Sequence, residues 1–133
     1  MFIYCDGGSR GNPGPAGIGV VILDAKKKKL KELWKYIGET TNNIAEYTAL
    51  IHGLEEAANL KADEITIHMD SELVVKQLCG EYKVKNANIR PLFEKALGIL
   101  KKFQAFEVKH IGREKNKEAD KLVNRALNLS SLF

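Results

Sequence analysis

The sequence predicts a single α/β domain in which helices flank a five-stranded mixed β-sheet. In the first forty residues, short apolar runs are separated by glycine-, proline- or lysine-rich segments, which is typical of strands with short connections. After Thr41 the apolar spacing becomes helical, and helical segments then alternate with strand-like ones. A chain of 133 residues, 44% of them hydrophobic, is sufficient for one folded domain.

The N-terminal part of the chain predicts an antiparallel meander of three strands. Residues 2–6 form a short apolar run, and residues 7–17 are rich in glycine and proline, which predicts a loop. Residues 19–23 predict the second strand and residues 30–38 the third, separated by a charged turn at 24–29. Because short connections join neighbouring strands, these three strands should pair in sequence order.

The rest of the chain predicts helices that alternate with two further strands. Thr41, Asn42 and Asn43 supply the polar side chains that cap helix N-termini, and Pro91 suits the first turn of a helix. A helix connects the first and fourth strands, so these strands should run parallel, and we expect them to be neighbours. The expected helices cover 44–59, 71–78, 89–103 and 116–129, and the expected strands cover 64–69 and 105–111.

Four acidic residues lie where charge does not stabilise a soluble domain. Asp6 and Asp70 each follow an apolar strand, while Glu46 and Asp120 fall on the apolar faces of two expected helices. Buried unpaired carboxylates are costly, so four acids without matching bases indicate a divalent metal site, with two ions expected. Asp6 and Asp70 should meet at the carboxyl edge of the sheet, where α/β sheets open a binding crevice.

Each of these acids also has a simpler explanation when it is taken alone. Asp6 suits a turn, and Asp70 suits a helix cap. Glu46 suits the first turn of a helix, and Asp120 could pair with a lysine. Four acids directed at one sheet edge nevertheless favour a metal site, and two metals at one site indicate phosphoryl-transfer chemistry.

Composition limits the kinds of partner that the protein is expected to bind and the cellular compartment in which it is expected to act. The formal net charge is +4 despite the four clustered acids, and a basic surface around an acidic site suits a polyanionic substrate. No run approaches the roughly 20 apolar residues of a membrane span. The first strand begins at once, which leaves no room for a signal peptide. We therefore expect a monomeric cytoplasmic protein without membrane association.

Four segments of the chain together resemble the type 1 ribonucleases H. They are residues 6–14 (DGGSRGNPG), 41–46 (TNNIAE), 70–74 (DSELV) and 113–120 (REKNKEAD), which follow the order of the family. The resemblance implies one catalytic domain over 1–133 with an RNase H-like fold, strand order 3-2-1-4-5 and an antiparallel second strand. It also implies hydrolysis of the RNA strand of RNA/DNA hybrids with two Mg²⁺ ions, for which Mn²⁺ substitutes, leaving 5′-phosphate and 3′-hydroxyl ends.

The same resemblance assigns a role to each acid. Asp6 would bridge both metals, and Glu46 and Asp70 would hold the metal nearer the leaving group. Asp70 and Asp120 would hold the metal on the side of the nucleophile. The chemistry is consistent, because two metals ~3.5–4 Å apart neutralise both the attacking and the leaving oxygen, and Mg²⁺ prefers oxygen ligands.

Substrate contacts are also implied by the family. Asn12, Asn42, Asn43 and Glu72 match residues that lie at the minor groove of the hybrid. The 2′-hydroxyl exposed there distinguishes RNA from DNA. Thr41 matches a contact to the DNA backbone phosphate. For Asn42 and Asn43, simple helix capping is an alternative, and the two roles are compatible.

Two features depart from the bacterial members of the family. Many of them carry a histidine where this chain has Arg113, which stays protonated and cannot act as a base. We expect Arg113 to bind a phosphate in the catalytic site, with an altered rate or metal preference. Residues 81–86 replace a longer basic helix, and we expect no separate hybrid-binding domain, so Lys83 and Lys85 are left to contact DNA phosphates with weaker affinity.

Several expectations keep an alternative. Gly7 and Gly8 either let the backbone approach the RNA closely or form a tight turn. The chain as a whole could be a nuclease of the same superfamily that acts on double-stranded RNA, or a non-catalytic nucleic-acid-binding module. The apolar tail at 127–133 is expected to pack on the sheet or to contact another chain.

Overall fold

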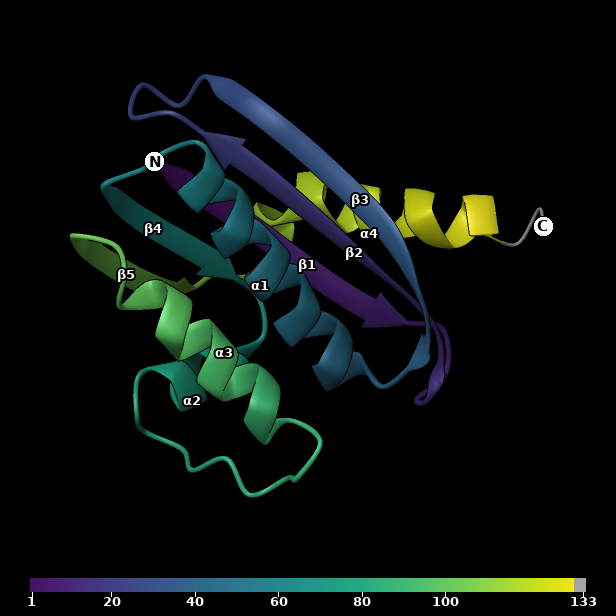
Figure 1. Cartoon of the computed structure of the whole chain (residues 1–133). Helices are drawn as coiled ribbons and strands as arrows, with labels where there is room; N and C mark the ends of the chain where they lie inside the picture. The colour runs from purple at the N-terminus through teal and green to yellow at the C-terminus, as the bar shows by residue number, and fades with distance from the viewer. Residues whose placement is uncertain (131–133) are drawn as a thin grey trace.

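The computed structural model describes residues 1–130, which form a five-stranded mixed sheet with helices on both faces (Figure 1). The strand order is β3-β2-β1-β4-β5, with β2 antiparallel to both neighbours and β4 parallel to both of its own. This confirms the predicted fold class, meander and order. The strands are β1 (Phe2–Ser9), β2 (Gly14–Leu23), β3 (Lys29–Thr40), β4 (Glu64–Met69) and β5 (Ala105–His110). The helices are α1 (Asn42–Asn59), α2 (Glu72–Leu78), α3 (Arg90–Leu100), the 3₁₀ turn η1 (Arg113–Lys115) and α4 (Lys117–Ser130).

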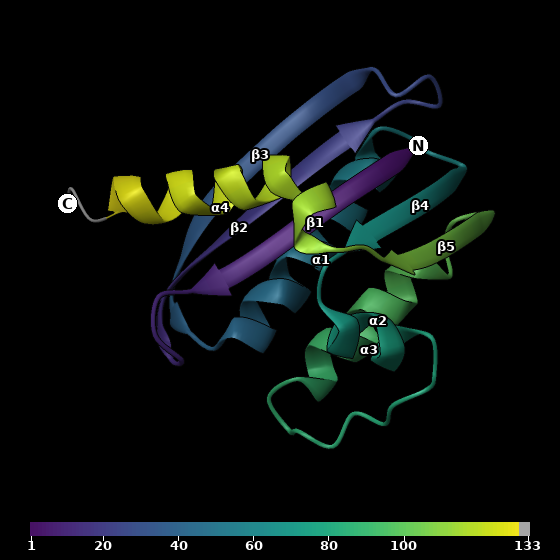
Figure 2. The ribbon, with the colours of Figure 1, turned by 180° about the vertical axis from the view of Figure 1, so that it is seen from behind.

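The helices form two layers around the sheet. α1 packs on β1 and β2 and contacts α3, whereas α4 crosses β1, β2 and β3 on the opposite face (Figure 2). Leu50 and Ala57 of α1 and Val123 and Leu127 of α4 are buried, which confirms the apolar faces expected for these helices. Residues 131–133 of the apolar tail lie outside the described residues. Within residues 1–130 no helix combines the length and the apolar character needed to cross a bilayer.

The first two strands are longer than the sequence predicts. β1 continues to Ser9 and β2 begins at Gly14, so the expected loop over 7–17 is reduced to a turn at 10–13. The prediction that Asp6 ends the first strand is therefore wrong, because this residue lies inside β1 and pairs with Gly19 of β2. Glycine usually weakens a strand, and a glycine kept inside one often marks a close approach of another backbone.

Two of these strand glycines allow helices to pack directly on the sheet. A Cβ at Gly7 would lie 2.2 Å from the carbonyl oxygen of Ala45 in α1. A Cβ at Gly19 would lie 2.4 Å from the carbonyl oxygen of Ala119 in α4. Only a residue without a side chain fits at such distances. α1 and α4 therefore approach the β1–β2 pair from opposite faces, on either side of Asp6.

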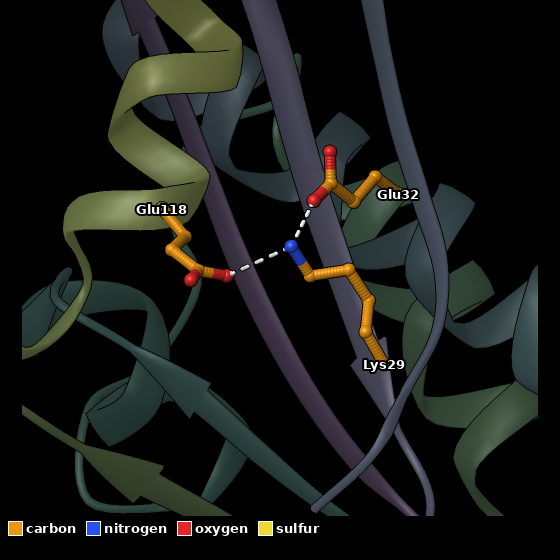
Figure 3. A network of polar contacts seen from close by, with 3 residues as sticks. All are labelled: Lys29, Glu32 and Glu118. Carbon is orange, nitrogen blue, oxygen red and sulfur yellow. Dashed lines mark hydrogen bonds and ion pairs between the residues drawn. The ribbon is translucent and has the colours of Figure 1, made fainter.

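An exposed ion network joins β3 to the start of α4. The Nζ of Lys29 lies between the carboxylates of Glu32 in β3 and Glu118 in α4 (Figure 3). The distance from Lys29 Nζ to Glu118 Oε2 is 3.6 Å. Exposed pairs of this kind are screened by solvent and contribute little stability. The network links the first turn of α4 to the edge of the sheet.

Candidate active site

Asp6 and Asp70 lie next to each other on neighbouring parallel strands. Cys5 of β1 pairs with Met69, the last residue of β4. Asp6 is the residue after Cys5, and Asp70 is the residue after Met69, so the two acids lie side by side. We expected this proximity from the sequence, because a helical connection between the first and fourth strands makes them parallel and neighbouring. Asp6 reaches it from within β1, and Asp70 from the turn before α2.

The other two acids come from helices on opposite faces of the sheet. Glu46 lies in the second turn of α1, and Asp120 lies in the first turn of α4. All four acids line one cavity of about 380 Å³. Asp6 is at its electrostatic centre, because the other three carboxylates all act on it and Asp120 is hydrogen-bonded to it. The remaining lining residues are Gly7, Gly8, Ser9, Arg10, Asn42, Ser71, Arg113, Val123, Asn124 and Leu127.

The acidic site holds its carboxylates in unfavourable surroundings. Burial, together with the charges of Asp70, Asp120 and Glu46, raises the pKa of Asp6 to about 8. Burial also raises the pKa of Glu46, although a hydrogen bond from Ser71 opposes the change. Burial raises the pKa of Asp70 above its ordinary value, and the positive charge of the nearby Arg113 only reduces the size of this increase. Such shifts are typical of sites that bind cations or carry out chemistry.

The residues present fit a hard divalent cation. The Oε2 atom of Glu46 is buried without a hydrogen-bond partner, and every acid supplies the oxygen ligands that such ions prefer. Among residues 1–130, no group of three His, Cys, Asp or Glu side chains is already gathered as a metal cage. The carboxylates line a shared cavity instead, which suits ions that keep water in several coordination positions.

The expected substrate residues around the start of α1 are connected to one another. The Oδ1 of Asn42 accepts the N–H of Ser9 (2.9 Å), and the Oδ1 of Asn12 accepts the N–H of Asn42 (3.1 Å). Thr41 caps α1, since its hydroxyl accepts the N–H of Ile44 (3.3 Å). The side chain of Asn42 therefore joins the helix to β1 rather than capping it.

A second cavity of about 220 Å³ lies beside this helix start. Asn12, Thr41 and Asn43 line it from one side, and Asn86 and Asn88 line it from the loop between α2 and α3. Ile44 and Ile89 complete its wall. The sequence showed only that residues 81–86 replace a longer basic helix, because nothing local indicates that this loop reaches the start of α1.

The remaining expected contacts divide into two groups. Glu72 on α2 and Lys83 and Lys85 on the following loop are exposed, and none of them lines the acidic cavity. Gly7 and Gly8 do line it, and the tight-turn alternative for them is wrong because both lie in β1. A Cβ at Gly8 would meet its nearest atom, Asn42 Oδ1, at an ordinary 3.7 Å.

Three polar residues at the site were not foreseen. Arg10 lines the acidic cavity, and its Nη2 donates to the Oδ1 of Asn128 on α4 (2.6 Å). Asn124 also lines the cavity, with its Nδ2 3.5 Å from Asp120 Oδ2. Asn116 is buried beneath the site. The sequence offered two signals: Arg10 and Asn116 lie in the segments 6–14 and 113–120 that resemble the family, and Asn116 is a helix-capping residue type at the start of the expected helix 116–129.

The first prediction concerns the metal-free protein. Asp6→Asn should make it more stable by on the order of 1–3 kcal/mol at pH 8, because the variant removes a charge that burial and three neighbouring acids disfavour. Since folding raises the pKa of Asp6 from 3.8 to about 8, the native protein loses stability as the pH rises through this interval. The difference in unfolding free energy between the variant and the parent should therefore be small near pH 4 and greatest near pH 8. Urea unfolding in EDTA at both pH values measures it, and an equal advantage at both would contradict the prediction.

A mixed sheet in the order 3-2-1-4-5, with four carboxylates around the junction of β1 and β4, defines the class of RNase H-like domains. Residues 4–126 match the reverse transcriptase-like family. The chain is also 32% identical over 140 aligned positions to a ribonuclease H of Pseudomonas savastanoi pv. phaseolicola, covering 95% of this chain and 91% of that protein. The protein belongs to the ribonuclease H family.

Two further relatives extend this comparison. A bifunctional protein of Mycobacterium tuberculosis is 42% identical over 98% of this chain, which spans only 36% of that protein. The crystal structure of LC11-RNase H1 in complex with an RNA/DNA hybrid has 49% identity and a TM-score of 0.91, with 97% of each chain covered. The chain therefore corresponds to about a third of the mycobacterial protein and to nearly all of the LC11 enzyme.

Proposed function

We propose that this chain cleaves the RNA strand of RNA/DNA hybrids with two Mg²⁺ ions, leaving 5′-phosphate and 3′-hydroxyl ends. The observation that carries the proposal is the cavity in which three other acids, each from a separate element, surround Asp6. The similarity to LC11-RNase H1, whose structure contains such a hybrid, supports the choice of substrate. We further expect the domain to act as a cytoplasmic monomer.

Asp6, Glu46, Asp70 and Asp120 are the residues that would hold the metal. When bound, the ions supply a nucleophilic hydroxide from water and stabilise the departing oxyanion. The unpaired Oε2 of Glu46 and the raised pKa of Asp6 support this assignment, because both carboxylates gain a favourable partner in a cation. Mn²⁺ is also compatible with carboxylate ligands and is expected to substitute.

The substrate side of the site is polar and basic. Asn12, Asn42 and Asn43 are suited to contact the minor groove, where the 2′-hydroxyl both donates and accepts hydrogen bonds. Arg113 lies beside Asp70 and is suited to bind a phosphate near the scissile bond. Its guanidinium cannot take up a proton from water, so Arg113 orients the substrate and does not act as a base.

The outer contacts extend this surface along the duplex. Thr41 is suited to a DNA phosphate, and Gly8 offers backbone close to the acids. Lys83 and Lys85, both exposed, would bind phosphates further from the cleavage point, with Glu72 nearer the RNA. Contacts of this kind depend on charge, so hybrid binding should weaken steeply as salt increases.

Arg10 gives the second prediction. Arg10→Ala should raise KM several-fold and reduce the salt dependence of hybrid binding by about one phosphate contact, with kcat nearly unchanged. The reason is its position: Asn128 holds its guanidinium at the rim of the acidic cavity, where a substrate phosphate can be reached. Arg125→Ala, which removes the same charge from an exposed position of α4 outside the cavity, is the control. Equal salt slopes for the two variants would contradict this role for Arg10.

A cleavage panel on one sequence tests the proposed function. The substrates are an RNA/DNA hybrid, duplex RNA, duplex DNA and single-stranded RNA, each labelled on one strand and incubated with Mg²⁺ or Mn²⁺. We expect cuts only in the RNA of the hybrid, with 5′-phosphate ends. Equal cutting of duplex RNA would support a nuclease of broader specificity. Hybrid binding without cleavage in either metal would support a non-catalytic module.

A further inference from the structure

Asn116 is a buried polar residue at the base of the acidic site. Its side chain is 1% exposed, and within residues 1–130 only Gln77 is also both polar and buried. The Nδ2 of Asn116 donates to the carbonyl oxygen of Cys5 (2.9 Å), across 111 residues of sequence. Cys5 directly precedes Asp6 in β1, so this bond fixes the strand at the residue before the central acid.

The same residue also contacts two other acids. Its side chain hydrogen-bonds Asp70 and stabilises the ionised form of that carboxyl. Its backbone carbonyl accepts the N–H of Asp120 (3.1 Å), the first helical bond that holds this acid in α4. One asparagine therefore connects β1, the end of β4 and the start of α4.

The orientation of the Asn116 amide follows from its partners. The Cys5 carbonyl and the Asp70 carboxylate are both acceptors, so the amide nitrogen must face them. The Oδ1 atom is left buried without a partner in the protein. A buried unpaired acceptor is unfavourable, so stability alone does not account for an asparagine here.

We propose that Asn116 is a positioning residue of the metal site, which holds Asp6, Asp70 and Asp120 in fixed relation to one another. The inference rests on the proposed function, because it treats these acids as metal ligands. Residues that orient metal ligands typically change metal affinity or activity 10- to 100-fold when they are replaced. Asn116 would act through the acids and would not touch the reacting atoms.

The test uses two variants of Asn116 and one control. Asn116→Asp keeps the shape but replaces the amide donor with a second acceptor, and Asn116→Ala removes the side chain. Gln77→Ala is the matched control, because it removes the other buried amide, whose Oε1 accepts the hydroxyl of Tyr47 (2.6 Å). The primary readout is Mn²⁺ affinity without substrate, measured by calorimetry at a temperature where each variant is folded by circular dichroism. Hybrid cleavage against Mg²⁺ concentration is the second readout.

We expect both Asn116 variants to bind Mn²⁺ at least tenfold more weakly and to need correspondingly more Mg²⁺ for cleavage. Gln77→Ala should lose stability but keep the parental metal affinity. If one Asn116 variant does not fold, the other decides. Parental Mn²⁺ affinity in a folded Asn116 variant would overturn the inference and leave the proposed function intact. A parent chain that neither binds Mn²⁺ nor cleaves the hybrid would overturn the proposed function, and the inference with it.

Discussion

Asp6→Asn should reduce cleavage of the RNA strand by at least about 10³-fold, which corresponds to roughly 4 kcal/mol of transition-state stabilisation. The variant keeps the shape of the side chain and removes the one carboxylate on which the other three all act. An amide oxygen is a weaker metal ligand than a carboxylate, so the variant would hold less firmly the cations that neutralise the phosphodiester. The loss should appear in kcat, because the substrate contacts lie elsewhere along the cavity.

Single-turnover cleavage of a labelled hybrid at saturating enzyme measures this loss. Glu55→Gln is the control, because it removes an exposed acid from α1, the helix that also carries Glu46, and should keep parental activity. Fluorescence anisotropy should show that the Asp6→Asn variant still binds the hybrid, since one negative charge fewer faces a polyanion. A single-turnover cleavage rate within tenfold of the parental rate would contradict the central role of Asp6 in the mechanism.

The second large effect is expected at Gly7, where replacement by alanine should destabilise the protein by at least about 3 kcal/mol. The new Cβ would lie 2.2 Å from the Ala45 carbonyl oxygen and 2.7 Å from the Glu46 backbone nitrogen. Both are backbone atoms, so no side-chain rotation relieves the overlap, and α1 must move away from β1. That movement would carry Glu46 away from Asp6, so activity should fall as well.

Gly8→Ala is the matched control for this substitution. It adds the same methyl group one residue later in β1, where the nearest atoms are Asn42 Oδ1 at 3.7 Å and Val123 Cγ1 at 3.8 Å. We expect its stability to stay within about 1 kcal/mol of the parent. Urea unfolding of both variants makes the comparison. Similar losses at the two positions would mean that strand propensity, rather than contact with α1, explains the glycine at position 7.

The sequence predicted those parts of the fold that depend on local pattern. The 64–69 run and the apolar faces of α1 and α4 stand out because burial repeats with the period of a strand or a helix. The ends of β1 and β2 were misplaced because glycine and proline locally indicate a loop. In the folded chain, close packing of α1 and α4 keeps those glycines inside the sheet. Tertiary contact therefore overrides the local signal at Gly7, which the sequence placed in a loop.

The same limit applies to the site. The four acids were recognisable because each places charge on a surface that is otherwise apolar, and the structure brings them to one cavity. Arg10 has no comparable signal in the sequence, because it lies in a polar turn. Its position at the cavity is held by a hydrogen bond to Asn128, which is 118 residues away in the sequence. The bond from Asn116 to Cys5 spans 111 residues and is equally invisible in the local pattern. Residues that support an active site from a distance need the three-dimensional structure to be found.

The arrangement of the acids along the chain also has a consequence for protein synthesis. β1, α1 and the turn after β4 supply three carboxylates early, whereas Asp120 belongs to α4, the last helix of the described chain. Domains fold as units while the N-terminal part emerges first from the ribosome. The nascent chain thus remains without its fourth carboxylate until α4 has been translated and docked across β1, β2 and β3.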